Sequence, residues 1–285
     1  MHKRFSWWLA ALLVAMPWVS RAADAPRVVA LGGDITEIVY ALDAQQALVG
    51  VDSTSQWPEA ARQLPDVGYV RQLAAEGVLS LHPQLVLATH DAGPPAVLDQ
   101  LRAAGVRIET LPVARTPDAV VAKVEQVGNL VGRKAAAETL ANQLRGQYAA
   151  LGRAVAAMPR HPRVLFLMSA GAGSPMAAGR DTAADSAIML AGGVNAASGL
   201  DGYKAVSPES LAALAPDVIM MMRERSEAWG GIDGALKLPG VAMTPAGRAR
   251  RVVLVEGQAL LGFGSRNAAQ ELAVQRVLAA IQLQP

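Results

Sequence analysis

The sequence predicts an α/β protein made of two α/β lobes, each with a central, mostly parallel sheet, joined by one long linker α-helix. Three observations predict this fold. Short apolar strands alternate with helical stretches in both halves of the chain. Residues 134–156, between the halves, form an unbroken run of helix-forming residues. A pattern of Glu, Pro and apolar residues also occurs once in each half, and 285 residues suffice for two domains of ordinary size.

The first half begins with a short strand at Arg27–Leu31 that ends in Gly32 and Gly33. Asp34 is followed three residues later by Glu37, a spacing that predicts a capping box at the start of a helix. A helix is expected at Pro95–Ala104. Further apolar strands are expected at Leu48–Val51, Leu85–Ala88 and Val106–Thr110. This βαβ order predicts parallel strands covered by helices.

A helix over Lys134–Ala156 would be about 35 Å long at about 1.5 Å per residue. Pro159 and Pro162 end it, and a second α/β pattern follows. That pattern runs through Val164–Leu167, Ile188, Val218–Met221 and Arg251–Val255 to a closing helix at Asn267–Leu283. We therefore expect an N-terminal lobe at 23–132, a linker helix at 133–158 and a C-terminal lobe at 159–285.

An internal repeat supports this division. Residues 76–90 read EGVLSLHPQLVLATH, and residues 209–223 read ESLAALAPDVIMMMR. In both, Glu precedes Pro by seven positions, and one polar residue then leads into an apolar strand. A helix–Pro–strand junction is common in α/β proteins, so a chance match is the alternative. Because ligands sit beyond the carboxyl ends of parallel strands, Thr89, His90, Met222 and Arg223 are expected at the edge of a shared cleft.

The first 22 residues have the pattern of a cleavable signal peptide. A short basic start, His2-Lys3-Arg4, precedes the apolar run Phe5–Val19, and Ser20-Arg21-Ala22 supplies small residues for cleavage. The run is shorter than the roughly 20 residues that span a bilayer, although an N-terminal membrane anchor is the alternative. No Cys follows, so we expect an exported protein without a lipid anchor, most simply in a bacterial periplasm.

Composition and motifs exclude several classes of function. Formal net charge is +2, and it becomes −1 without the basic residues of the signal segment, so a nucleic-acid partner is not expected. The absence of cysteine excludes disulfides and thiolate metal sites. No metalloprotease, P-loop, dinucleotide-binding or hydrolase motif occurs, and His82, His90 and His161 are too scattered for a zinc site. An enzyme stays an alternative, but no residues indicate one.

Residues 27–285 resemble the periplasmic haem-binding proteins of bacterial haem-uptake ABC transporters, within the helical-backbone (class III) substrate-binding proteins. The haem subgroup is marked by G-Y-x-R-x-L at 68–73 and by LLGFG-x-R at 260–266. The segments that carry the resemblance are VVALGGDITEIVYALDA (28–44), VGYVRQLAAEGVLSLHPQLVL (67–87), GSPMAAGRDTAAD (173–185), YKAVSPESLAALAPDVI (203–219) and LPGVAMTPAGRARRVVLVEGQALLGFGSR (238–266).

The resemblance implies that Tyr69 is the axial ligand of ferric haem, the transported ligand. Ferric iron is hard and favours a phenolate oxygen. Arg71, two residues on, can lie on the same side of an extended segment and donate to that oxygen, and we expect it to be the partner of Tyr69. A family variant adds a His from the second lobe, but the corresponding loop, 169–173, contains none. Weaker cleft candidates are Arg223 for a haem propionate and Tyr203, Met176 and Phe263 for the porphyrin, whereas His90 is expected to be an ordinary surface residue.

The same resemblance implies transport partners. Glu76 and Glu209 hold equivalent places in the two repeats, and related proteins use one Glu per lobe to pair with arginines of the two permease subunits. The expected partners are therefore haem, an inner-membrane ABC permease dimer with its ATPase and an outer-membrane haem receptor upstream, with this chain a monomer. Two alternatives stay open: a siderophore or cobalamin binder of the same fold, and an enzyme that acts on tetrapyrroles or sugars.

Overall fold

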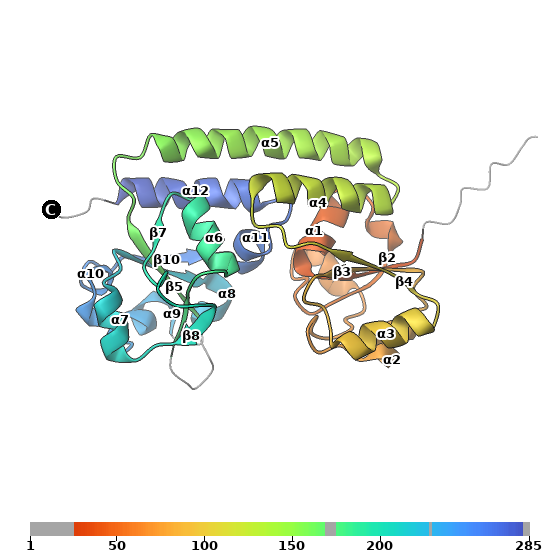
Figure 1. Ribbon diagram of the computed structural model, residues 1–285, viewed down its shortest axis with the longest axis horizontal. Helices are drawn as coiled ribbons and strands as arrows, with labels where there is room; N and C mark the ends of the chain where they lie inside the picture. The colour runs from red at the N-terminus through yellow and green to blue at the C-terminus, as the bar shows by residue number, and fades with distance from the viewer. Residues whose placement is uncertain (1–25, 169–174, 228–229, 282–285) are drawn as a thin grey trace, which may run out of the picture.

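The computed structural model describes residues 26–168, 175–227 and 230–281, and in it two α/β lobes lie beside a layer of long helices (Figure 1). The N-terminal lobe holds a four-stranded sheet in the order β2-β1-β3-β4, with every pair parallel. Its elements are β1 Val28–Leu31, α1 Gly33–Ala41, β2 Leu48–Val51, α2 Ala75–Leu79, β3 Leu85–Thr89, α3 Pro95–Ala103, β4 Arg107–Leu111 and α4 Pro117–Leu130.

The sheet of the C-terminal lobe has the order β10-β9-β5-β6-β8, and β7 pairs with β5. Strands β10, β9, β7 and β5 are parallel, whereas β6 runs antiparallel to both neighbours. The lobe's elements are β5 Arg163–Met168, β6 Met176–Ala178, α6 Ala183–Leu190, β7 Val194–Asn195, β8 Tyr203–Ala205, α7 Pro208–Leu214, β9 Val218–Met222, α8 Arg223–Ser226, α9 Gly231–Leu236, α10 Pro245–Arg248, β10 Val252–Val255, α11 Gly257–Leu261 and α12 Asn267–Ala280.

Helix α5, Lys134–Ala156, spans the whole molecule and has the predicted limits. Helix α4 lies along the half of α5 above the N-terminal lobe, and α12 lies along the other half (Figure 1). One apolar cluster passes through this layer and joins the inner faces of both sheets; it includes Val28, Val124, Leu144, Phe166 and Val274. The two lobes therefore share a hydrophobic core, and separating them would expose apolar surface to water.

The two lobes repeat one frame, as the sequence predicts. Arg27 precedes β1 and donates to the carbonyl of Leu81, which lies two residues before Pro83. Arg163 begins β5 and donates to the carbonyl of Leu214, two residues before Pro216. Each arginine thus ties the helix–Pro–strand segment of its lobe to the first strand of that lobe, which fixes the segment against the sheet.

One expectation about local structure is wrong. Asp34 and Glu37 do not form a capping box, because Gly32 is the N-cap of α1 and no side chain caps it. The Asp34 carboxylate instead pairs with Lys123 Nζ at 2.5 Å, and Glu37 binds residues of the other lobe. Both carboxylates thus form ion pairs with residues remote in sequence, and neither caps the helix as their spacing predicts.

Two expected segments, the signal peptide and the closing helix, lie at the ends of the chain. The signal peptide at 1–22 lies outside the described residues, as does Leu283 at the end of the expected closing helix. Within the described ranges, α12 ends at Ala280. No helix in these ranges is both long and apolar enough to cross a membrane.

Candidate functional site

A cleft of about 1290 Å³ lies between the lobes, at the carboxyl ends of their parallel strands. Thr89 and His90, which follow β3, line it from one lobe, and Met222 at the end of β9 lines it from the other. The position of the cleft therefore agrees with the expectation from strand ends. Sites for drug-sized molecules usually measure about 300–1,000 Å³, so this cleft has room for a larger ligand.

Tyr69 lies on a loop of the N-terminal lobe that is fixed on two sides. Val67 N–H donates to the carbonyl of Val51 in β2, and Gly93 N–H donates to the carbonyl of Val70. Between these anchors Gly68 has φ of 94°, a conformation that side chains rarely adopt, and this turn presents Tyr69 to the cleft. The tyrosine is 37% exposed although it belongs to a well-anchored segment, so its ring is available to a ligand.

A chain of polar groups supports the Tyr69 hydroxyl. Arg71 Nη1 donates to Tyr69 Oη, and Arg71 Nε donates to Asp91 Oδ2 at 2.7 Å. Thr89 Oγ1 donates to the second oxygen of Asp91 at 2.8 Å. Burial alone would raise the pKa of Asp91, but the hydrogen bonds from Thr89 and Arg71 and the charge of Arg71 outweigh it and lower that pKa. Asp91 thus stays ionised and holds the guanidinium against the phenol.

The facing wall belongs to the C-terminal lobe and is less polar. Tyr203, Met176 and Phe263 all line the cleft, so the three apolar candidates from the sequence come together there. Phe263 is only 2% exposed and is mainly a core residue, whereas Met176 and Tyr203 are half-buried. Burial raises the pKa of the Tyr203 phenol, which therefore resists ionisation. The two cleft tyrosines thus lie in unlike surroundings.

Arginines line the cleft on both sides, but Arg223 is not among the lining residues. Its guanidinium donates to the carbonyl of Leu254 in β10, because α8 begins at Arg223 and turns it toward the sheet edge. The neighbouring Arg225 lines the cleft instead, as does Arg62 from the other lobe. Within the described ranges neither Arg62 nor Arg225 has an ion-pair partner, so both are available to an anionic ligand.

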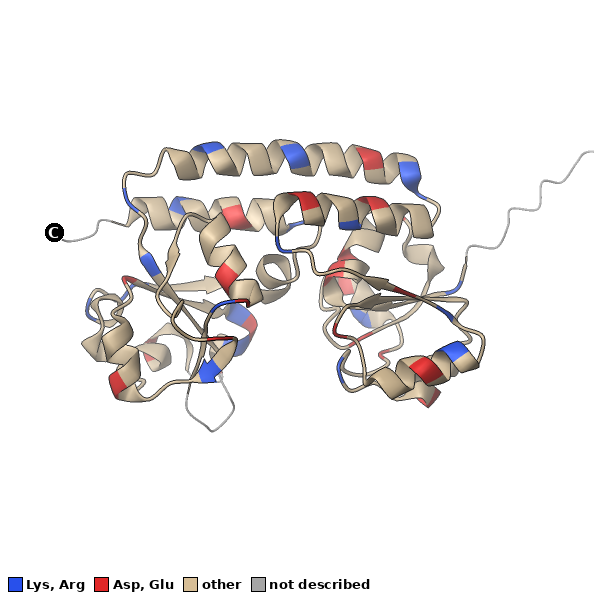
Figure 2. Ribbon diagram, in the orientation of Figure 1, with Lys and Arg blue, Asp and Glu red and all other residues tan. Residues whose placement is uncertain are grey.

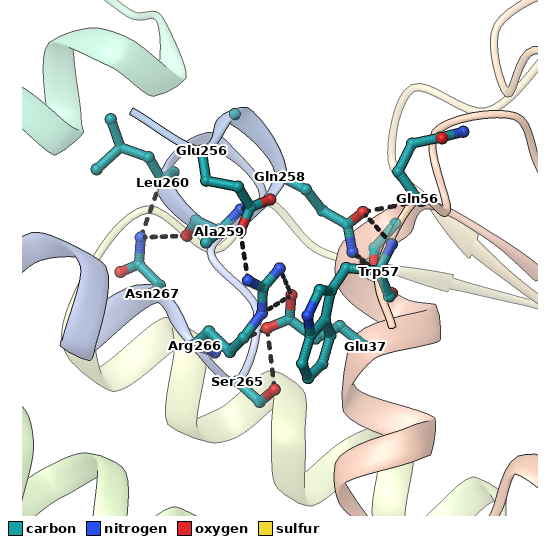
Figure 3. A network of polar contacts seen from close by, with 12 residues as sticks. Glu37, Gln56, Trp57, Glu256, Gln258, Ala259, Leu260, Ser265, Arg266 and Asn267 are labelled. Carbon is teal, nitrogen blue, oxygen red and sulfur yellow. Dashed lines mark hydrogen bonds and ion pairs between the residues drawn. The ribbon is translucent and has the colours of Figure 1, made fainter. Parts of the chain in front are cut away.

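A network at the floor of the cleft joins the lobes (Figure 3). Arg266 Nε donates to Glu37 Oε2 at 2.9 Å, and Arg266 also pairs with Glu256. The Gln258 side chain accepts from Trp57 N–H at 3.0 Å and donates to the Trp57 carbonyl at 3.1 Å. Sequence reasoning did not find these residues, although Trp57 is one of only two tryptophans after residue 22.

The glycines of the LLGFG-x-R motif explain how this floor packs so closely. A Cβ on Gly264 would lie 2.9 Å from Glu37 Oε1, and a Cβ on Gly262 would lie 3.3 Å from Asp34 Cβ, both in the N-terminal lobe. The same segment accepts a hydrogen bond from Lys123 Nζ at the carbonyl of Gly262. The motif is therefore a structural element in which missing side chains let the second lobe reach the first.

Glu76 and Glu209 lie in the first turns of α2 and α7, both exposed. These helices lie at the ends of the two lobes that are remote from α5 (Figure 1). Acidic residues, drawn in red, occur at this end of both lobes (Figure 2). Hydrogen bonds from its own backbone N–H and from Ser207 lower the pKa of Glu209, which keeps it ionised. The structure thus presents one carboxylate per lobe on the same side of the molecule.

The loop 169–173, where the sequence lacks a His, lies outside the described residues. Among residues that the structure does describe, no group of three or more His, Asp or Glu side chains is arranged to hold a bare metal ion.

This fold and cleft define a two-lobed binding protein with a rigid helical backbone. The chain belongs to the periplasmic binding protein family, whose model matches residues 28–259. Similar solved structures include the periplasmic haem-binding protein RhuT from Roseiflexus sp. RS-1, with a TM-score of 0.85 and 41% identity over 90% of this chain and 98% of that chain. The haem-binding protein BhuT, in complex with two haems, has a TM-score of 0.84 and 40% identity over 89% and 98%.

The chain is also similar to a relative that is named for a different ligand. A cobalamin-binding protein of Halobacterium salinarum is 31% identical over 204 residues, which are 70% of this chain and 54% of that protein. The chain thus spans about half the length of this relative.

Proposed function

We propose that this protein captures haem in the cleft between its lobes and delivers it to an inner-membrane ABC permease. The observation that carries the proposal is the exposed Tyr69, whose hydroxyl is held by Arg71 at the wall of a cleft of about 1290 Å³. Similarity to haem-binding proteins over nearly the whole described chain supports it. The protein acts as a carrier in the periplasm, and no reaction is assigned to it.

Tyr69 is the axial ligand of ferric iron in this proposal. A phenolate oxygen suits ferric haem, and Arg71 stabilises the negative charge on that oxygen. Asp91 keeps Arg71 in place through its own ionised carboxylate. Met176 and Tyr203 pack against the porphyrin from the other lobe. Tyr203 is unsuited to ligate iron because its phenol resists ionisation.

The haem propionates require cations at the cleft edge. We assign them to Arg62 and Arg225, which line the cleft from opposite lobes, and not to Arg223, whose guanidinium is turned toward Leu254. Arginine suits this role because its planar fork matches a carboxylate in a bidentate manner.

Delivery depends on Glu76 and Glu209. Two carboxylates, one at the outer end of each lobe, fit a permease built from two equivalent subunits. Such charge pairs chiefly set orientation and the rate of association. The apolar core that the two lobes share through the helical layer opposes their separation, which favours a defined spacing of the two carboxylates.

A cobalamin carrier is the second candidate, and the Halobacterium salinarum relative favours it. The Tyr69–Arg71–Asp91 chain argues against it, because cobalamin already carries groups on both faces of its corrin and leaves no open axial position for a protein phenolate, whereas haem has one.

Titration of hemin into the purified exported protein tests the proposal. The expected result is a high-spin ferric spectrum with a phenolate charge-transfer band. A spectrum identical to that of free hemin would contradict it. A parallel titration with cyanocobalamin separates the two candidates: tight binding of cobalamin without binding of hemin would support the second.

A further inference from the structure

We infer that Trp57 is a binding residue that stacks on the flat ring of the ligand, and that Arg266 of the opposite lobe positions it. The inference rests on the proposed function and deepens it, because it assigns a residue that selects a planar macrocycle independently of iron. Its starting point is that Trp57, a large apolar side chain, is 39% exposed and lines the cleft. Tryptophan is among the residues that contribute most to binding where a ligand covers them, because its large, rigid ring buries much apolar area.

Trp57 is held from the second lobe at both its backbone and its ring. The amide of Gln258 brackets the backbone, accepting from Trp57 N–H and donating to the Trp57 carbonyl. The guanidinium carbon of Arg266 lies 3.9 Å from the centre of a ring of the indole (Figure 3). This distance is that of a cation stacked on an aromatic face, so Arg266 fixes the orientation of the ring.

Arg266 is itself immobilised. Glu37 is fully buried, and it accepts hydrogen bonds from Arg266 Nε and from Arg266 N–H, the latter at 2.7 Å. Glu256 pairs with the other end of the guanidinium. Two carboxylates from different lobes therefore hold one cation, and this cation holds one face of the indole. A ring positioned before the ligand arrives loses little conformational freedom on binding.

The geometry favours a flat ligand. An indole stacks on a macrocycle only where that macrocycle offers an open face, as a porphyrin does. Cobalamin carries groups on both faces of its corrin, so Trp57 would gain little contact with it. Trp57 therefore discriminates between the two candidate ligands by shape, whereas Tyr69 discriminates by coordination.

Metal-free protoporphyrin IX is the probe that isolates this contact, because it has the flat ring but no iron for Tyr69. We expect Trp57→Leu to weaken its binding about tenfold, near the upper end of the effect of one aromatic pair. Trp57→Phe, which keeps a smaller ring, should lose about threefold or less. Arg223→Ala is the control, because Arg223 does not line the cleft and its guanidinium donates to the Leu254 carbonyl; it should bind metal-free protoporphyrin IX as the wild type does.

Arg266→Gln tests the positioning role. It should weaken binding of metal-free protoporphyrin IX less than Trp57→Leu does. In a Trp229→Phe background it should also lower the fluorescence anisotropy of Trp57 in the ligand-free protein, since the ring is released. Equal binding by wild type and Trp57→Leu would overturn the inference. If hemin still gave the phenolate spectrum in that case, the proposed function would stand; if hemin did not bind to the wild type at all, the proposed function would fail first.

Discussion

The two lobes share a frame but differ in the loops that face the cleft. Arg27 and Arg163 make equivalent contacts, and Glu76 and Glu209 begin equivalent helices. On this common frame, the N-terminal lobe carries an exposed tyrosine with an arginine on its hydroxyl. The C-terminal lobe carries Tyr203, which is half-buried, and burial raises the pKa of its phenol.

The repeat therefore contains two kinds of feature: those that occur in both lobes and those that occur in one. Glu76 and Glu209, which we propose contact the two permease subunits, occur once in each lobe. The tyrosine with an arginine on its hydroxyl, which we propose binds the iron, occurs in the N-terminal lobe alone among the described residues. Substitutions that remove these features from one lobe or from both test this difference.

The largest effect is expected from loss of the tyrosine in the N-terminal lobe. Tyr69→Ala should lower hemin affinity by more than about 100-fold, because losing a residue that only hydrogen-bonds a metal ligand already costs about 10- to 100-fold in metal affinity. Tyr203→Ala removes the counterpart and should cost less than about tenfold, as it loses only packing. Equilibrium titration of both variants checks this, and equal losses would contradict the difference between the lobes.

Transport should depend on the duplicated carboxylates. Glu76→Ala combined with Glu209→Ala should leave hemin affinity unchanged and slow uptake by the permease at least about tenfold, within the range by which charge pairs alter association rates. Each single variant should show an intermediate loss. ATP-driven haem uptake into liposomes that contain the cognate permease is the measurement. Wild-type uptake by the double variant would reduce both residues to favourable charges at helix starts.

Loss of the arginine beside the tyrosine should have a moderate effect. Arg71→Ala should weaken hemin binding about tenfold while the protein keeps iron ligation by Tyr69, because the cation supports the oxygen but does not bind the metal. Arg223→Ala is the control from the other lobe and should bind hemin as the wild type does, since its guanidinium is bound to Leu254. A stronger defect in Arg223→Ala than in Arg71→Ala would reverse the assignment.

The smallest effect concerns pH. The pKa of Asp91 is lowered in the folded protein, so its contribution to stability is fully present above the pKa of an unfolded aspartate, about 3.9. That contribution is lost as the pH falls through the lower folded value. Asp91→Asn should therefore be less stable than wild type at pH 7 and should lose less stability on acidification. Urea unfolding at neutral and acid pH measures this; a difference that persists unchanged below the folded pKa of Asp91 would contradict it.

The sequence was sufficient for the frame because its signals are local. Helix formers bounded by Gly132 and Pro159 predict the limits of α5, and the Glu-to-Pro spacing predicts the paired helices. Tyr69 and Arg71 are two residues apart, so their contact also follows from local geometry.

The remaining site residues could not be predicted from the sequence, because their contacts join residues that are far apart in the chain. Trp57 meets Gln258 across 201 positions, and Lys123 takes Asp34 across 89 positions, which removed the expected capping box. Arg223 was placed at the cleft from its position after β9, but α8 begins at that residue and turns it away. No local pattern encodes such contacts, although Trp57, one of only two tryptophans after residue 22, was a signal for the site.

Resonance Raman spectroscopy of the hemin complex tests most directly whether Tyr69 binds the iron. The wild type should show phenolate modes enhanced through the charge-transfer band. Tyr203→Phe should retain these modes, and Tyr69→Phe should lose them, because its ring remains while the oxygen is gone. Phenolate modes that persist in Tyr69→Phe would contradict the account and place the iron ligand elsewhere.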